Sequence, residues 1–318
     1  NCSLIQYQTL RIPSGKTLDL EGGAVVRASV KFENVENAAL SGRGMISLAD
    51  WNTQTGLNDG TSSNYLPAVV IIQSNNIRVD GIIINRSCYF SICMQNSANI
   101  TLDNLKIISS QINSDGINGY SCHDITITNC FVRSSDDGIA IYNDASDSYS
   151  WNVQDTALWS DGAHAIFIGL HGTADSSNRT TIRDLIFKNI YIPEVYCQWK
   201  EYFGVIGIVA GDENICRDIT FEDIRIDDYS RSKLFEIRTG TLSDYSPAPG
   251  YLVENIIFRN ISYNGDYYRY DSTVSGYNSE RVVNHIVFEN FYFNGKKVTS
   301  AADADITIKD YAYNILFQ

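Results

Sequence analysis

The stretch Asn76-Ile-Arg-Val-Asp-Gly-Ile-Ile-Ile84 sets a pattern that returns along most of the chain. In each copy a polar residue precedes an aliphatic one, an alternating run follows, Asp or Asn interrupts it, and a second alternating run closes the phrase. The aliphatic anchors Ile77, Ile100 and Ile125 lie 100 − 77 = 23 and 125 − 100 = 25 residues apart. A period of this length is typical of a solenoid built from stacked coils. Later copies begin at Asn99, Asp124, Asp184, Asp218, Asn255 and His285.

The repeat predicts an all-β protein, a single-stranded right-handed parallel β-helix in which each coil contributes two or three short strands. Strands of stacked coils pair in parallel about 4.8 Å apart, so inward aliphatic residues form one continuous core and outward positions are free to carry function. The alternative is a β-sandwich, which has strand spacings of about 8–12 residues and hairpin turns. We expect one β-helix domain over residues 1–318, with an N-terminal cap and the first coils in residues 1–70.

The charge balance limits the classes of partner. The 318 residues carry 24 Lys and Arg against 37 Asp and Glu, a formal net charge of −13. This excludes nucleic acid as a partner, because its phosphates need Lys and Arg, and it disfavours a strongly anionic polysaccharide unless a local basic groove overrides the global charge. No apolar run reaches the roughly 18 residues of a membrane span, so no membrane contact is expected, and no signal peptide is apparent.

The cysteine count is odd. Seven cysteines leave room for at most three disulfides, and sequence alone does not fix the pairing. None of their spacings is that of a zinc site, so no metal is expected. The pairs closest in sequence are Cys88 with Cys93, Cys122 with Cys130, and Cys197 with Cys216.

Two consecutive coils carry nearly the same acidic phrase, Asn113-Ser-Asp-Gly-Ile117 and Ser134-Ser-Asp-Asp-Gly-Ile139. Asp115 and Asp136 are 136 − 115 = 21 residues apart, about one coil, so we expect them side by side on one outer face, with Asp137 beside them. Close like charges raise at least one pKa. A carboxylic acid that keeps its proton donates to a leaving oxygen while ionised neighbours activate water, which is the division of labour that glycosidic cleavage requires.

Two other interpretations of the acidic phrases stay open. Asp-Gly is a common turn pair, and three aspartates also suit a calcium site. On the following coil His164 comes slightly more than one period after Asp137, so an outward loop at residues 144–150 would place it on the same face. There it would hold a carboxylate or a sugar hydroxyl, although a lone histidine is often structural; His171 is a second candidate.

The acidic phrases resemble the polygalacturonase-like clan of enzymes, glycoside hydrolase families 28 and 49. Family 28 carries Asn-Thr-Asp, Asp-Asp, Gly-His-Gly and Arg-Ile-Lys motifs in this order. Asn113-Ser-Asp115 and Asp136-Asp137 match the first two, and Ala163-His-Ala165 is a degraded form of the third. No Arg-Ile-Lys occurs, and the nearest phrase, Phe235-Glu-Ile-Arg238, lacks the lysine.

Several further phrases look more like family 49, the dextranase and isopullulanase group. In pectin-cleaving members the Arg and Lys hold the galacturonate carboxylate, so their absence favours a neutral α-glucan as substrate. A pectin-type substrate, of the polygalacturonase or rhamnogalacturonase kind, is the alternative. The family 49-like phrases are Gly22-Gly-Ala-Val-Val26, Ser41-Gly-Arg-Gly44, Ser114-Asp-Gly116, Asp136-Asp-Gly-Ile139, Asn152-Val153 with Trp159, Tyr202-Phe-Gly204 and Leu234-Phe-Glu-Ile-Arg238.

The resemblance implies an inverting glycoside hydrolase that acts on a polysaccharide or oligosaccharide. It implies that Asp136 is the general acid, that Asp115 and Asp137 activate the water, and that no metal or organic cofactor is needed. From this substrate class we expect a secreted or periplasmic location. A polysaccharide lyase on the same fold and a non-catalytic carbohydrate-binding solenoid are the competing functions.

Four residues are candidate sugar contacts. His164 lies near the carboxylates in the expected stacking, and Arg238 would donate hydrogen bonds in a fixed fork. Trp159 and Tyr202 would pack their aromatic faces on the apolar faces of sugar rings. Each of the four is equally compatible with a role in packing the solenoid.

Overall fold

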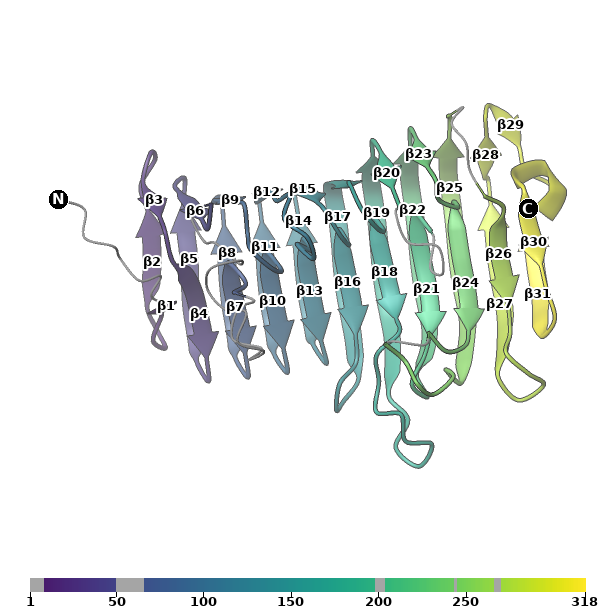
Figure 1. Cartoon of the computed structure of the whole chain (residues 1–318), viewed down its shortest axis with the longest axis horizontal. Helices are drawn as coiled ribbons and strands as arrows, with labels where there is room; N and C mark the ends of the chain where they lie inside the picture. Colours follow the sequence, from purple (N-terminus) through teal and green to yellow (C-terminus); the bar gives the residue numbers. More distant parts are fainter. Residues whose placement is uncertain (1–8, 50–65, 198–203, 243–244, 266–269) are drawn as a thin grey trace.

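The chain folds into a right-handed parallel β-helix, as predicted (Figure 1). The computed structural model describes residues 9–49, 66–197, 204–242, 245–265 and 270–318. Its strands stack along one axis from the N-terminal to the C-terminal end, and almost all of the pairings are parallel. None of the helical turns in these ranges has the length and apolar character that a membrane crossing requires.

One flat parallel sheet of eleven strands forms a single face of the solenoid, and it carries the candidate site. Each strand is three to five residues long. Its members, in order, are β1 (Thr9–Arg11), β4 (Ser29–Glu33), β7 (Val69–Ile72), β10 (Ile92–Gln95), β13 (Ile117–Tyr120), β16 (Ile139–Tyr142), β18 (Ile166–Gly169), β21 (Ile206–Ala210), β24 (Phe235–Thr239), β26 (Ser272–Ser275) and β30 (Ile306–Ile308).

The remaining twenty strands form a second, bent sheet that closes each coil, and a short 3₁₀ turn η2 (Ala301–Ala304) lies near the C-terminal end. These strands are β2 (Thr17–Leu20), β3 (Val25–Val26), β5 (Glu36–Gly42), β6 (Met45–Ser47), β8 (Asn75–Asp80), β9 (Ile83–Asn85), β11 (Ala98–Asp103), β12 (Lys106–Ile108), β14 (His123–Thr128), β15 (Phe131–Ser134), β17 (Ser148–Ser160), β19 (Thr181–Ile192), β20 (Val195–Tyr196), β22 (Ile215–Ile226), β23 (Tyr229–Ser230), β25 (Leu252–Tyr263), β27 (Val282–Glu289), β28 (Tyr292–Phe293), β29 (Lys296–Lys297) and β31 (Ala312–Phe317).

The Asn and Asp residues of the repeated phrase bend each coil. Asn76, Asn99 and Asp124 all have φ between 54° and 56°, in the left-handed region that Asn and Asp tolerate best among non-glycine residues. They also connect the coils, because the Asn99 amide donates to the Asn75 side-chain oxygen at 2.7 Å. The backbone conformation required at this position therefore explains why Asn or Asp opens these phrases.

Inward positions stack from coil to coil and form the core. The predicted anchors Ile77, Ile100 and Ile125 pair in register and are 1% exposed, which confirms the repeat. In the C-terminal half the core holds a continuous phenylalanine stack, with ring centroids 4.8 to 5.1 Å apart. Its members are Phe187, Phe221, Phe258, Phe288 and Phe317.

The three cysteine pairings suggested by sequence proximity are wrong for this structure, in which the six cysteines of the described ranges are free. Cys122 and Cys130 show the reason. They flank the six-residue strand β14, which separates them by about 3.3 Å per residue, whereas a disulfide needs Cα atoms within about 7 Å. Two cysteines at opposite ends of one strand are therefore too far apart to form a disulfide, although they are close in sequence.

The phenylalanine stack gives the first prediction. Replacing the fully buried Phe221 with Ala removes a ring that contacts both its neighbours, and we expect the free energy of unfolding to fall by about 3–5 kcal/mol. Urea unfolding followed by circular dichroism measures the change. The control is Ile186→Ala on β19, where the side chain is 47% exposed and the expected loss is within about 0.5 kcal/mol. Equal losses in the two variants would contradict the stacked core.

Candidate active site

Asp115, Asp137 and His164 occupy equivalent positions on three successive coils. Each lies two residues before its strand in the eleven-stranded sheet. Ile117 of β13 pairs with Ile139 of β16, and β16 pairs with β18 in the same register. The strand pairing therefore brings two carboxylates and one imidazole into a row on one face.

Asp136 stands one residue ahead of this row. The sequence interval predicted Asp136 as the equivalent of Asp115. Because Ile117 pairs with Ile139, the residue that corresponds to Asp115 on the next coil is Asp137. The prediction that all three carboxylates share one patch is matched by the structure, in which the three aspartates line a single pocket.

The glycines that follow the aspartates allow the coils to approach closely. A Cβ atom at Gly116 would lie 2.3 Å from the carbonyl oxygen of Gly138, and one at Gly138 would lie 2.6 Å from that of Ala165. Real Cβ atoms do not come so near a backbone oxygen. Glycine is therefore required here for coil stacking directly beneath the carboxylates.

Asp137 is held by donors on both of its oxygens. The His164 Nδ1–H donates to Oδ1 at 2.6 Å, and the His164 backbone N–H reaches the same oxygen at 3.2 Å. The Tyr142 hydroxyl donates to Oδ2 at 3.1 Å. His164 is fully buried and stacks on Phe167 with a centroid distance of 4.3 Å. These contacts fix the orientation of the carboxylate.

Asp115 lies deep in the same patch. Its Oδ2 accepts a hydrogen bond from the Asn118 amide at 2.7 Å. Burial, followed by the negative charges of Asp136 and Asp137, raises the pKa of Asp115 well above its ordinary value. The hydrogen bond from Asn118 opposes that rise, because it favours the ionised form.

Asp136 has the environment of a carboxylic acid. It is half-buried, and its carboxyl group accepts a hydrogen bond from the backbone N–H of Asp137 at 3.1 Å. Burial, and then the charge of Asp137, raises the pKa of Asp136 to about 7, with the nearby His164 acting in the opposite direction. Asp136 therefore keeps its proton in weakly acidic solution.

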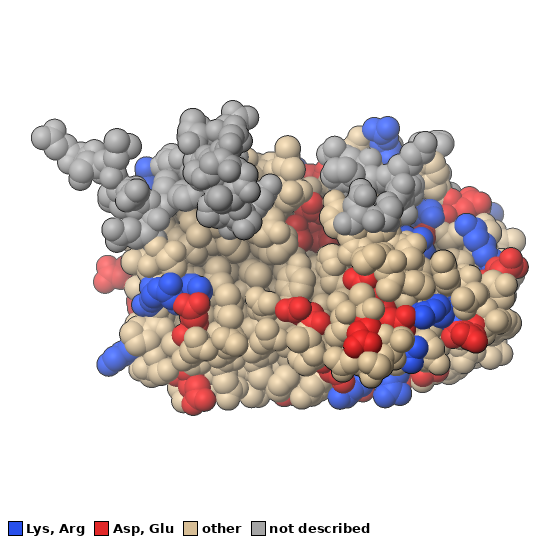
Figure 2. Space-filling view, turned by 60° about the horizontal axis from the view of Figure 1, so that its bottom comes forward, with Lys and Arg blue, Asp and Glu red and all other residues tan. Residues whose placement is uncertain are grey.

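A pocket of about 220 Å³ opens above the three carboxylates. Figure 2 shows acidic side chains gathered in a hollow of this face. Aromatic and apolar side chains form much of the wall around the acids, which is the usual character of a ligand-binding pocket. The other lining residues are Tyr89, Phe90, Asn113, Tyr120, Tyr142, Phe167, Leu170, His171 and Tyr245.

The structure places the predicted sugar contacts in different surroundings. His164 sits behind Asp137, fully buried. Trp159 belongs to β17 of the other sheet, where Arg133 lies over its ring at 4.2 Å. Arg238 is on β24, with its Nε 3.4 Å from Glu236 Oε1, and neither Trp159 nor Arg238 lines the pocket. Tyr202 falls outside the described residues.

Sequence reasoning missed the side chains that hold the carboxylates. Asn118 comes three residues after Asp115, and Tyr142 comes five residues after Asp137. Both intervals are odd and do not follow the two-residue alternation of a strand, because each aspartate precedes the strand that carries its partner. No alternation pattern therefore identified Asn118 and Tyr142. The stacked pair Tyr89 and Phe90, with ring centroids 3.8 Å apart, lies in a turn and gave no signal either.

The described part of the chain contains no group of three His, Cys, Asp or Glu side chains that is arranged to bind a metal ion. The residues around the pocket instead bind one another, as Asp137 does with His164 and Tyr142.

The solenoid thus places three carboxylates in one outer pocket. The chain belongs to the glycosyl hydrolases family 28, whose model matches residues 7–194. The match gives no support for the expectation that the chain lies closer to family 49.

Curated relatives and solved structures agree with this placement. The chain is 30% identical over 206 residues to "Polygalacturonase QRT2" of Arabidopsis thaliana, which covers 61% of this chain and 43% of that protein. It is 25% identical over 258 residues to "Probable endopolygalacturonase C" of Aspergillus aculeatus, and this alignment covers 71% of this chain and 62% of that protein. The chain thus spans about half the length of the curated relatives it matches.

The fold is shared with solved polygalacturonases. An exopolygalacturonase from Thermotoga maritima superposes with a TM-score of 0.70 at 16% identity, over 97% of this chain and 83% of that one. The polygalacturonase from Erwinia carotovora gives a TM-score of 0.63 at 15% identity, over 96% and 85%. At these identities the likeness establishes the β-helix alone.

The carboxylate environments give the second prediction. We expect the Asp136 carboxyl to titrate near pH 7 in ¹³C NMR of protein labelled at the aspartate carboxyls. Asp137→Asn lowers this midpoint, because it removes the neighbouring negative charge that raises the pKa of Asp136. Asp147→Asn, outside the cluster, leaves it unchanged. If the Asp136 midpoint is the same in the wild type and in Asp137→Asn, the proposed electrostatic interaction between the two carboxyl groups is contradicted.

Proposed function

We propose that this chain is an O-glycoside hydrolase that cleaves a pectin-type polysaccharide with inversion at the anomeric carbon. One observation carries the proposal: Asp115, Asp136 and Asp137 share one pocket in unequal hydrogen-bonding environments. Family membership and relatives named as polygalacturonases support the reaction class and the polymer. They favour the pectin-type alternative over the α-glucan that the missing Arg-Ile-Lys suggested.

Asp136 is the general acid in this proposal. It donates its proton to the glycosidic oxygen as the bond from that oxygen to the anomeric carbon breaks. The raised pKa of Asp136, about 7, keeps the proton available under weakly acidic conditions, which is the tuning that acid catalysis by a carboxyl group needs.

Asp115 and Asp137 activate the water that attacks the opposite face of the sugar. Asp137 takes a proton from the water as the water oxygen bonds to the anomeric carbon, and Asp115 helps to hold that water, so the product carries the inverted configuration. Asp137 is oriented for this by His164 and Tyr142, and Asp115 by Asn118. Proton exchange with solvent then restores the starting state.

We also infer a secreted or periplasmic site of action, because a polymeric pectic substrate does not enter the cytoplasm. Fractionation of the producing cells with an antibody against the chain tests this. Recovery of the protein solely from the cytoplasmic fraction would contradict it.

The third prediction concerns the reaction itself. Incubated with polygalacturonate, methyl-esterified pectin, rhamnogalacturonan and dextran, the chain should hydrolyse at least one pectic polymer and leave dextran intact. Proton NMR of the fresh product should show the inverted anomer. Asp136→Asn should lower kcat by about 100- to 10,000-fold, because the general acid is lost.

Each competing function has its own signature in this assay. An unsaturated product that absorbs in the ultraviolet would indicate a lyase. Retained configuration would contradict the single displacement. Binding without cleavage, unchanged in Asp136→Asn, would indicate a non-catalytic carbohydrate-binding solenoid.

The fourth prediction is a pH profile. The rate should fall as pH rises through about 7, because Asp136 then loses the proton that it must donate. Tyr142→Phe removes one of the donors that orient the Asp137 carboxyl group, so kcat should fall by about tenfold. Tyr149→Phe, on the other sheet, is the control. A Tyr142→Phe enzyme that loses only thermal stability would show that the hydroxyl has a purely structural role.

A further inference from the structure

We propose that Tyr245 is a specificity-determining residue whose ring packs against a sugar in the catalytic pocket, and that Asp212 and Glu213 of a neighbouring turn position it. The inference rests on the proposed hydrolase function and adds residues to the same site. Three observations support it: the place of Tyr245 in the pocket wall, the path of its segment across the sheet, and the buried contacts that hold this segment.

Tyr245 closes the catalytic pocket from the C-terminal side of the solenoid. The pocket is also lined by Tyr89 and Phe90, which precede β10. The acidic coils of β13 and β16 lie between β10 and β24 in the sheet, so aromatic side chains enclose the carboxylates from both directions along the axis. Tyr245 is 49% exposed. A tyrosine offers a rigid apolar face and a polar tip, which suits a sugar ring with its apolar C–H faces and polar rim.

The segment that carries Tyr245 reaches back across two coils of the flat sheet. Residues 245–250 follow β24, whereas His171 follows β18, and β21 lies between these two strands. Burial lowers the pKa of His171, and a hydrogen bond to the Tyr245 backbone opposes this effect, so the two residues are in contact. The His171 ring lies 5.0 Å from that of Tyr142, whose hydroxyl donates to Asp137. Tyr245 is thereby linked to the wall that holds the catalytic carboxylates.

Asp212, on the turn after β21, holds this segment directly after Tyr245. The Asp212 Oδ1 accepts a hydrogen bond from the Ala248 N–H at 3.2 Å and lies 3.1 Å from the Ser246 Oγ. The Asp212 N–H donates to the Ala248 carbonyl at 2.7 Å. Ser246 is fully buried, and a Cβ atom at Gly211 would lie 2.2 Å from its Oγ. Glycine therefore lets the segment approach the turn closely enough for Asp212 to bind it.

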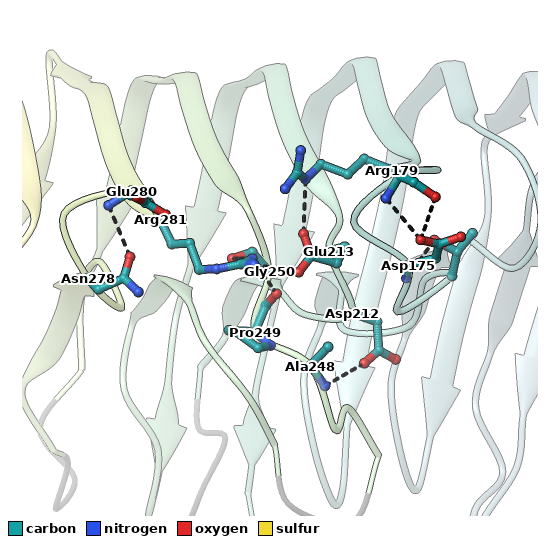
Figure 3. A network of polar contacts seen from close by, with 12 residues as sticks. Asp175, Arg179, Asp212, Glu213, Ala248, Pro249, Gly250, Asn278, Glu280 and Arg281 are labelled. Atoms are coloured by element: carbon teal, nitrogen blue, oxygen red, sulfur yellow. Dashed lines mark hydrogen bonds and ion pairs between the residues drawn. The ribbon is translucent and has the colours of Figure 1, made fainter.

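Glu213 holds the other end of the segment through an arginine. Arg281 Nη2 contacts Glu213 Oε1, and Arg281 Nη1 donates to the Pro249 carbonyl at 2.9 Å. Glu213 Oε2 also lies 2.9 Å from Arg179 Nε. Figure 3 shows Arg179 and Arg281 approaching Glu213 from different loops. Glu213 is 5% exposed, so one buried carboxylate connects its own turn with the loops on either side of it.

The backbone of this turn is unusual for the residues that it contains. Asp212 and Glu213 have φ of 46° and 64°, and the Asn214 N–H donates to the Gly211 carbonyl at 2.9 Å. Two successive positive φ values, as in a type I′ turn, favour Gly, Asn and Asp. Glutamate is disfavoured there, and such backbone strain persists where the surrounding structure imposes it. The contacts of the two carboxylates with the segment of Tyr245 and with Arg281 give both acidic residues a role at these positions.

The test of the sugar contact uses whichever of polygalacturonate, methyl-esterified pectin and rhamnogalacturonan the wild type cleaves fastest. Tyr245→Ala should raise KM by about three- to tenfold and leave kcat within about twofold, because the ring holds the substrate and the transition state alike. Tyr245→Phe keeps the ring and should change KM by less than about twofold. Tyr313→Ala is the control, since this tyrosine is 50% exposed on β31 of the other sheet, and it should change neither constant.

A double-mutant cycle tests the positioning role. Glu213→Gln removes the charge that holds Arg281 and should raise KM as Tyr245→Ala does. In the Tyr245→Ala background it should raise KM no further, because a residue that acts through Tyr245 then has nothing left to position. Arg281→Lys keeps the charge but loses the guanidinium fork, and it makes the same test if Glu213→Gln does not fold. Glu222→Gln alters a glutamate that binds two cations on the other sheet and should leave KM unchanged.

The outcomes separate the two proposals. A wild type that cleaves a pectic polymer, together with a Tyr245→Ala enzyme of unchanged KM, would overturn the sugar contact and leave the hydrolase function standing. Equal rises of KM in Tyr245→Phe and Tyr245→Ala would overturn the packing of the ring on the sugar. A further rise of KM when Glu213→Gln is added to Tyr245→Ala would overturn the positioning role. Cleavage of none of the three polymers by the wild type would overturn the hydrolase function and this inference with it.

Discussion

The backbone hydrogen bonds between successive coils are the constraint on which the catalytic arrangement depends. The Gly116 N–H donates to the Asp137 carbonyl at 2.8 Å, and the Gly138 N–H donates to the His164 carbonyl at 2.8 Å. These bonds fix which outward positions are neighbours. A slip of one residue would turn every side chain of the strand to the opposite face. Coil stacking therefore assembles residues from separate coils into one site.

Gathering carboxylates in one pocket carries an electrostatic cost, and the pocket distributes it unevenly. Asp137 has donors on both oxygens, whereas Asp136 is left half-buried beside a negative charge, so its most stable form in weakly acidic solution is the acid. The same repulsion that destabilises the cluster thus produces two chemically different carboxyl groups.

The sequence predicted the solenoid because its local cause is visible in single residues: Asn76 and Asn99 adopt the left-handed conformation that bends each coil. The acidic patch was predictable from the period, but its register was not, because Asp136 and Asp137 both lie about one coil beyond Asp115. The role of Tyr142 required a known strand boundary. Trp159 was expected to contact the sugar, but the structure places it on β17 of the other sheet. The sequence did not indicate to which sheet this residue belongs.

The central claim is that coil stacking places the acid and the water-activating carboxylates on opposite sides of one glycosidic bond. A crystal structure of the Asp136→Asn variant with a bound pectic oligosaccharide tests it most directly. We predict the glycosidic oxygen within about 3.2 Å of the residue 136 side chain, and a water held by Asp115 and Asp137 on the far side of the anomeric carbon. An oligosaccharide bound with its linkages away from these three residues would contradict the account.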